Sequence, residues 1–287
     1  MEELEYKIWF SKLDISNKNR LKLLSDFGKC KDIWNLDKNI LKQKQYDDKI
    51  ISKIFDFSNK NNLEKEAKYL IEKNIKILNV YDNEFPKKLL EIPDCPSQIY
   101  IRGDIKKLYD DNIAIIGSRK ASDYGKRISR SIAKDFATLD INIVSGLAVG
   151  IDKFAHLGAL DVQGGKTIAV LGNGLYEKNL YPNENLKIYE RILNAGGTIV
   201  SEYSFFEKPK SYYFPARNRI ISGLSNKIIV VEAGEKSGSL ITVEFALEQG
   251  KDVYAVPGDI TKINSKGTNK LIQDGASLFL SVKDCFI

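Results

Sequence analysis

The chain has 287 residues, of which 43% are hydrophobic and 29% charged, and its formal net charge is +6. This balance is typical of a globular protein, and no apolar run approaches the ~20 residues that span a bilayer, so we expect no membrane insertion. The acidic start, Met1–Glu5, argues against a secretory leader, and three widely spaced cysteines argue against a disulfide framework or a zinc site. We therefore expect a cytoplasmic protein that holds no metal and no cofactor.

Residues 1–75 are predicted to form a small all-α domain, because apolar residues recur there at helical spacing. Examples are Leu21, Leu24 and Phe27, and further along Leu63 and Ala67. The spacing is compatible with a helix-hairpin-helix module, a kind of module that often contacts DNA. A protein-binding role or a purely structural cap explains the pattern equally well, so the partner of this domain stays open.

Residues 76–287 are predicted to form a second domain, in which short strands near 75–78 and at 98–101 precede alternating strands and helices. The later strands are expected at the apolar runs 113–116, 141–144, 167–171, 198–200, 227–231, 253–256 and 276–280. Helices are expected at 123–139, 151–161, 184–194, 216–223, 239–249 and 268–273. Strands that are apolar along their whole length predict a parallel sheet covered on both faces, and hence a doubly wound, Rossmann-like α/β domain.

The loops that follow these strands carry most of the distinctive polar residues. In a parallel sheet the ligand binds at the carboxyl ends of the strands, where glycine lets backbone N–H groups approach an anion. We therefore predict a phosphate-bearing ligand, although the loops contain neither a dinucleotide fingerprint nor a P-loop. The candidate residues in these loops are Gly117, Ser118, Arg119, Lys120, Ser145, Gly146, Gly172, Gly174, Ser237, Gly238 and Ser239.

The segment 208–219 adds cations and aromatic rings. Only eight of the 44 basic residues are arginine, and the planar guanidinium forms paired hydrogen bonds with phosphate that lysine cannot form. We predict that Phe214 stacks on a base, whereas Tyr212 and Tyr213 serve packing. The segment therefore predicts nucleic-acid binding. Its candidate binding residues are Lys208, Lys210, Phe214, Arg217, Asn218 and Arg219.

The single histidine, His156, lies four residues after Asp152 on a predicted helix, so the two side chains can face each other. This spacing fits either a catalytic pair or a hydrogen-bonded packing pair, and we expect the packing pair. We therefore expect a protein that is not an enzyme.

Short motifs spread in order over about 170 residues. They are Gly117-Ser-Arg119, Ser145-Gly-Leu-Ala with Gly150-Ile-Asp152 and His156, Tyr181-Pro182, Ser201-Glu202, Phe214-Pro-Ala-Arg-Asn-Arg-Ile-Ile221, Ser237-Gly-Ser-Leu240, Val256-Pro-Gly258, and Gly267-Thr-Asn269 with Gly275-Ala276. In this order they resemble the DprA/Smf DNA-processing family. The resemblance implies a sterile-alpha-motif-like helical domain followed by an extended Rossmann-like domain.

The resemblance also implies a function. Members of the DprA/Smf family bind the single-stranded DNA that enters the cell during natural transformation, protect it, and load the RecA recombinase onto it. Carried over by position, Arg119 contacts phosphate, Phe214 stacks on a base, and Arg217 and Arg219 line the same pocket. Family members form homodimers, and Leu247, Ile272 and Leu278 fall where the dimer surface is expected.

The sequence departs from the family pattern in three places. Val149 and Asn183 stand where relatives commonly have basic residues, and Lys210 lies one place earlier than the usual lysine. The pocket is then expected to be less basic, with Lys208 or Lys210 compensating. Because the chain ends soon after its last strand, we also expect no carboxy-terminal winged helix.

Two other functions stay open. Nucleoside-monophosphate phosphoribohydrolases have a similar Rossmann-like fold with a Pro-Gly-Gly-x-Gly-Thr loop, and Glu232–Ser239 occupies the comparable place here without the Pro-Gly-Gly core. A purely structural adaptor that acts through the helical domain is the third alternative. It predicts no affinity for nucleic acid.

Overall fold

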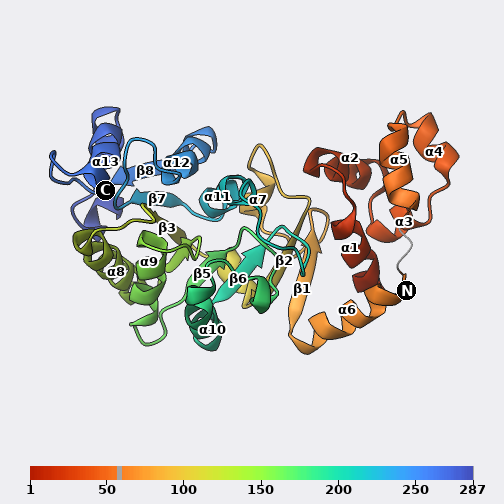
Figure 1. Cartoon of the computed structure of the whole chain (residues 1–287), viewed down its shortest axis with the longest axis horizontal. Coiled ribbons are helices and arrows are strands. Elements are labelled where there is room, and N and C mark those ends of the chain that lie inside the picture. The colour runs from red at the N-terminus through yellow and green to blue at the C-terminus, as the bar shows by residue number, and fades with distance from the viewer. Residues whose placement is uncertain (57–59, 287) are drawn as a thin grey trace.

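The computed structural model describes residues 1–56 and 60–286. Its amino-terminal part is helical, as predicted (Figure 1). Ser16 begins α2, because its side chain accepts a hydrogen bond from the Asn19 amide, and Gly28 ends it with a φ of +80°. The helices of this part are α1 (Glu3–Lys12), α2 (Asn17–Phe27), α3 (Cys30–Trp34), α4 (Lys38–Gln43), α5 (Asp48–Phe55) and α6 (Lys60–Glu72).

In the described part of the chain, one nine-stranded sheet forms, with the order β1-β2-β6-β5-β4-β3-β7-β8-β9. The strands are β1 (Ile75–Asn79), β2 (Gln98–Gly103), β3 (Asn112–Ile116), β4 (Asn142–Ser145), β5 (Thr167–Val170), β6 (Thr198–Ser201), β7 (Lys227–Val230), β8 (Asp252–Ala255) and β9 (Ser277–Leu278). The strands from β6 to β9 in this order are parallel. The sheet is not parallel throughout, however, because β2 runs antiparallel to both β1 and β6.

Helices cover both faces of the parallel part, as the apolar strands predict. Helices α8 and α9 pack on one face around Phe136 and Ile151, and α11 and α12 pack on the other around Ile220 and Val243 (Figure 1). The helices of this part are α7 (Lys87–Leu90), α8 (Asp123–Thr138), α9 (Ile151–Leu160), α10 (Leu186–Asn194), α11 (Tyr213–Gly223), α12 (Ser239–Glu248) and α13 (Ile263–Gln273). Across residues 1–56 and 60–286, no helix combines the length and apolarity needed to cross a bilayer.

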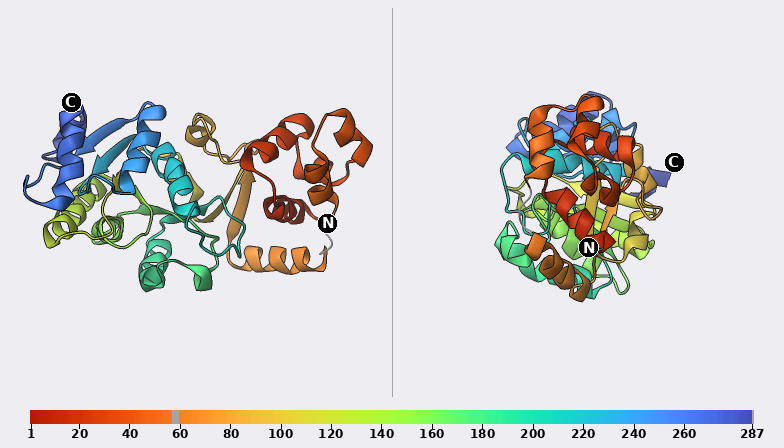
Figure 2. Two further views of the ribbon diagram at one scale, coloured as in Figure 1. Left: turned by 45° about the horizontal axis from the view of Figure 1, so that its top comes forward. Right: turned by 90° about the vertical axis from the view of Figure 1, so that its right-hand side faces the viewer.

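The helical bundle and the carboxy-terminal end of the chain lie at opposite ends of the molecule (Figure 2). The bundle nevertheless shares one hydrophobic cluster with the sheet, in which Trp9, Leu24 and Leu70 join Ile77 and Tyr100. A partly buried hydrogen bond of 2.7 Å between the hydroxyl groups of Ser11 and Tyr100 also joins the two parts. The domain boundary at residue 75 therefore stays a prediction, and the two parts pack as one core.

The order of the strands creates a switch point at β3. From β3 the chain proceeds through β4, β5 and β6 on one side, and then returns to place β7 on the other side of β3. The loops after β3 and β7 consequently leave the sheet next to each other and diverge. In doubly wound folds a crevice forms at this point, outside the carboxyl ends of the strands.

Candidate nucleic-acid interface

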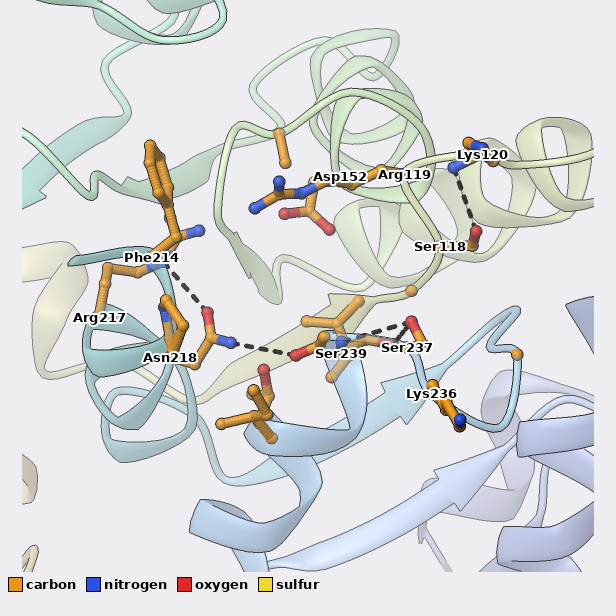
Figure 3. A pocket seen from close by; sticks show the side chains of 18 of the residues that line it. Ser118, Arg119, Lys120, Asp152, Phe214, Arg217, Asn218, Lys236, Ser237 and Ser239 are labelled. Atoms are coloured by element: carbon orange, nitrogen blue, oxygen red, sulfur yellow. Dashed lines mark hydrogen bonds between the residues drawn. The ribbon is translucent and has the colours of Figure 1, made fainter. Parts of the chain in front are cut away.

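A cavity of about 950 Å³ opens at this switch point, between the loop after β3, the loop after β7 and the amino-terminal turn of α11 (Figure 3). It brings together most of the candidates from the sequence. The predicted residues that line it are Gly117, Ser118, Arg119, Lys120, Lys210, Phe214, Arg217, Asn218, Ser237, Gly238 and Ser239.

Glu232 fixes the loop after β3. The Ser118 amide donates to the Glu232 carbonyl at 2.7 Å, and the Glu232 carboxylate accepts hydrogen bonds from the Ser122 amide at 2.9 Å and from the Ser122 hydroxyl. Ser122 is also the cap of α8. The protein's own carboxylate thus occupies the start of α8, where negative charge is favourable. The start of α8 is therefore already occupied, whereas Arg119 and Lys120 lie exposed on the same loop.

Arg119 and Phe214 face each other across the cavity. The Arg119 guanidinium lies 5.5 Å from the centre of the Phe214 ring, and the Tyr181 ring lies 5.5 Å from the same centre on another side. Phe214 rests on Gly172, where an added Cβ would approach the ring to 2.7 Å. In the described part of the chain no carboxylate pairs with Arg119. A cation next to a partly exposed ring is the arrangement that binds a phosphate and stacks on its base.

Arg217 lines the cavity from beneath. Only 3% of it is exposed, and its guanidinium donates to the carbonyl of Gly146 at 2.8 Å and to the carbonyl of Val170. Burial lowers the pKa of Arg217 to about 10, and the nearby charge of Arg119 acts in the same direction. Arg217 therefore joins the ends of β4 and β5 and adds positive potential below the cavity, rather than reaching freely toward a ligand.

Arg219 does not line the cavity, which corrects the expectation from the sequence. Its guanidinium forms two hydrogen bonds with the Glu202 carboxylate, at 2.8 and 2.6 Å, and its Nε donates to the Asp94 carbonyl at 2.8 Å. Burial alone would lower the pKa of Arg219, but the hydrogen bonds with Glu202 outweigh burial and raise it. Arg219 is a structural cation that ties α11 to the segments around Asp94 and Glu202.

Five further candidates do not line the cavity. Ser145 donates to the Ile115 carbonyl at 2.7 Å, and Gly174 donates from its amide to the Glu207 carbonyl at 2.9 Å. Gly146 and Gly172 leave room for Arg217 and Phe214, respectively. Lys208 is exposed on the surface but is not part of the cavity wall.

The loop after β7 closes the cavity opposite Arg119. Asn218 joins it to α11 by a hydrogen bond of 3.4 Å from its side-chain amide to the Gly238 carbonyl, and the hydroxyl groups of Ser237 and Ser239 lie 2.8 Å apart (Figure 3). Lys236 and Tyr181 are among the residues of the wall that sequence reasoning did not name as candidates. Lys236 stands inside a glycine- and serine-rich loop after a strand, and this position was the available signal.

Asp152 and His156 do not hydrogen-bond to each other in the described structure. The Gly146 amide donates to the Asp152 carboxylate at 3.1 Å, and the Leu147 amide donates to Nε2 of His156 at 3.2 Å. Burial lowers the pKa of His156 to about 3, so the ring is neutral. Its Nδ1 then donates to the Thr167 hydroxyl at 2.7 Å. Asp152 and His156 are therefore not the expected hydrogen-bonded pair. Each separately holds the loop after β4, Asp152 at Gly146 and His156 at Leu147.

No group of three or more His, Cys, Asp or Glu side chains suited to a metal ion occurs in residues 1–56 and 60–286.

The family model of DNA recombination-mediator protein A matches residues 76–287. The chain belongs to this family. Within the family, it is 45% identical over 198 residues to Protein Smf of Escherichia coli, covering 69% of this chain and 52% of that protein.

A second member of the family, the DNA processing protein DprA of Streptococcus pneumoniae, is 43% identical over 206 residues, which cover 72% of this chain and 71% of that protein. Its crystal structure aligns with all of this chain and 97% of its own at a TM-score of 0.77 and 34% identity. DNA processing protein A of Helicobacter pylori, whose structure describes a single-stranded DNA binding mode, aligns with 74% of this chain and 93% of its own, with a TM-score of 0.65 and 32% identity.

Proposed function

We propose that this protein binds single-stranded DNA in the cavity at the switch point and acts as a recombination mediator rather than as an enzyme. The observation that carries the proposal is the pairing of Arg119, which has no carboxylate partner in the described structure, with the Phe214 ring. The guanidinium suits a phosphate, and the ring suits a base. The relationship to a protein with a described single-stranded DNA binding mode supports the same function.

The binding is expected to be independent of sequence. The cavity wall includes cations, hydroxyl groups and the rings of Phe214 and Tyr181, which suit the phosphates and the face of a base. Such contacts read no base edges and weaken as salt rises. We propose that the bound strand is protected in this way during natural transformation or homologous recombination, and that RecA is loaded onto it.

The test of this function is a competition experiment by fluorescence anisotropy. A labelled oligo-dT bound to the protein is challenged with unlabelled single strand, with duplex of equal length, and with AMP. We expect the single strand to displace the label most effectively. If AMP displaces the label and free adenine accumulates, the protein is a nucleotide hydrolase and the proposal is wrong. If no binding occurs, a structural adaptor is the better description.

Replacing Phe214 by leucine is expected to weaken binding of oligo-dT by ~1–3 kcal/mol, because stacking on one base is lost while apolar packing on Gly172 remains. Anisotropy titrations of the two proteins measure the difference. The matched control is Phe206→Leu, since Phe206 is an exposed phenylalanine outside the cavity wall. Equal affinities of Phe214→Leu and the parent protein would show that Phe214 does not stack on a base.

The carboxy-terminal edge of the sheet supports a homodimer. Leu247 and Leu278 are 64% and 44% exposed, Ile272 is partly exposed, and β9 is the edge strand. An edge strand flanked by exposed leucines is a surface that another chain can cover. We propose that two copies pair here, so that two cavities hold one strand and gain avidity.

Replacing Leu247 by glutamate is expected to produce a monomer, because it would place two carboxylates in the apolar centre of the dimer contact. Sedimentation velocity across a concentration series measures the change. The control, Ile71→Glu, alters an exposed isoleucine of α6 in the helical bundle, at the end of the molecule opposite this edge (Figure 2). The dimer proposal fails if the parent protein sediments as a monomer, or if Leu247→Glu leaves the dimer intact.

A further inference from the structure

A second concave surface lies on the outer side of α8 and α9, away from the cavity wall described above. It has a volume of about 480 Å³ and is lined by Asp123, Lys126, Arg127, Arg130, Ser131, Lys134, Phe154 and Asp161. We name it the α8–α9 groove. We propose that this groove binds the continuation of the same single strand of DNA, as a second contact site beyond the switch-point cavity. The inference rests on the proposed function.

The groove is positively charged because α8 places its cations on one side. Its buried positions, such as Ser129, Ala133 and Phe136, face the sheet and α9, while Arg127, Arg130 and Lys134 are exposed. Lys126 and Lys134 are eight residues apart, which corresponds to ~12 Å along the helix axis. The cations therefore form a row rather than a point, and a row of positive charge suits a chain of phosphates.

Two of the four cations have carboxylate partners at the rim of the groove. Lys126 pairs with Asp123 at 2.9 Å, and Arg130 pairs with Asp161 at 2.5 Å. In the part of the chain that the structure describes, Arg127 and Lys134 have no such partner. The exposed pairs are weak enough to exchange with a phosphate, and the two remaining cations are available without exchange. The groove holds four cations against two carboxylates, so an anionic partner is favoured.

Phe154 gives the groove a feature that a merely solvated row of cations lacks. It is partly exposed and belongs to the first turns of α9, so its ring lies among the cations that α8 contributes. Basic side chains interleaved with an aromatic ring are the usual composition of a single-strand binding surface, because the ring stacks on a base without regard to its identity. A small free anion would make no use of this ring.

The loop after β3 joins the cavity to the groove. Ser118 and Lys120 line the cavity, and Ser122 caps α8 only two residues later. The Ile151 amide of α9 donates to the Ser118 carbonyl at 3.2 Å, so α9 starts at the same loop. The two helices lie side by side from this loop onward (Figure 1). A strand that passes from Arg119 over this loop reaches the groove directly. The occupant of the groove is therefore the strand that the cavity already holds.

The test compares two lengths of oligo-dT in the double variant Arg127→Gln/Lys134→Gln. An oligonucleotide of about five residues fills only the cavity, whereas one of about 25 residues reaches the groove as well. We expect the variant to bind the short strand like the parent protein. We expect it to bind the long strand about five- to tenfold more weakly at low salt. The slope of log K against log salt should fall by ~1.4 for the long strand alone, because two phosphate contacts are lost.

The control variant Lys31→Gln/Lys42→Gln removes the same charge from exposed positions of the helical bundle, and it should leave both affinities unchanged. Phe154→Leu should weaken binding of the long strand selectively and leave the salt slope intact, because it removes stacking but no charge.

Unchanged binding of the long strand by the Arg127→Gln/Lys134→Gln variant would overturn the inference, and an acidic protein would then be the better partner for the groove. An equal loss for both strands would also overturn it, since α8 would then act on the cavity. If the parent protein binds neither strand, the proposed function itself fails.

Discussion

Replacing Arg119 by glutamine is expected to weaken single-stranded DNA binding roughly tenfold or more. Arg119 is exposed at the cavity, lies 5.5 Å from the centre of the Phe214 ring, and has no carboxylate partner in the described structure, so its charge is available to the ligand. A hydrogen bond to a charged group contributes ~1.5–3 kcal/mol, and the loss of one phosphate contact lowers the salt slope by ~0.7. Anisotropy titrations of oligo-dT across a salt series measure both quantities.

The matched control is Arg191→Gln, because Arg191 is an exposed arginine of α10 and does not belong to the cavity wall. It removes the same charge and should change neither the affinity nor the slope. If Arg119→Gln and Arg191→Gln behave alike, the effect is one of net charge and the assignment of Arg119 to a phosphate is wrong.

Replacing Arg219 by methionine is expected to have the opposite result, a large loss of stability with little effect on DNA affinity. The Arg219 guanidinium is buried and forms paired hydrogen bonds with Glu202 at 2.8 and 2.6 Å. Removing one partner of a buried ion pair leaves the other charge uncompensated, which costs ~3–5 kcal/mol. Urea unfolding measures the free energy, and anisotropy at low temperature measures the affinity of the folded protein.

A second variant keeps this prediction testable if the first one folds poorly. In Arg219→Met/Glu202→Gln the uncompensated carboxylate is gone, so we expect part of the lost stability to return. A fully stable Arg219→Met protein would show that the ion pair contributes little. If a folded Arg219→Met protein no longer bound DNA, Arg219 would have to be assigned to the binding site.

The parallel strands and most of their helices could be predicted from the sequence to within a few residues, but α13 begins at Ile263, five residues before its predicted start. Strands buried on both faces must be apolar along their length, so β3, β5 and β7 stand out as Ile- and Val-rich runs between polar loops. The antiparallel pairing of β2 with β1 and β6 could not be predicted, because direction depends on partners far away in the chain. The last strand was predicted too long, since β9 is an exposed edge with only β8 beside it.

The candidate site shows the same limit at the level of single residues. Arg217 and Arg219 share one motif, and the sequence treats them alike. Residues two apart on a helix point to different sides, so on α11 only Arg217 faces the cavity, whereas Arg219 faces Glu202. Lys236 was missed for a different reason: its position in a glycine- and serine-rich loop after a strand was a signal, but one lysine among many did not stand out until the fold placed it in the wall.

The most direct test of DNA binding in the switch-point cavity is photocrosslinking of a single strand that carries 5-iodouracil, followed by mass spectrometric mapping of the attached peptides. Halogenated uracil reacts with aromatic rings that stack on it. We predict that Phe214 or its cavity neighbour Tyr181 is crosslinked, and that unlabelled single strand suppresses the reaction far better than duplex does. Crosslinks confined to the helices α1–α6, with none in the cavity, would contradict it.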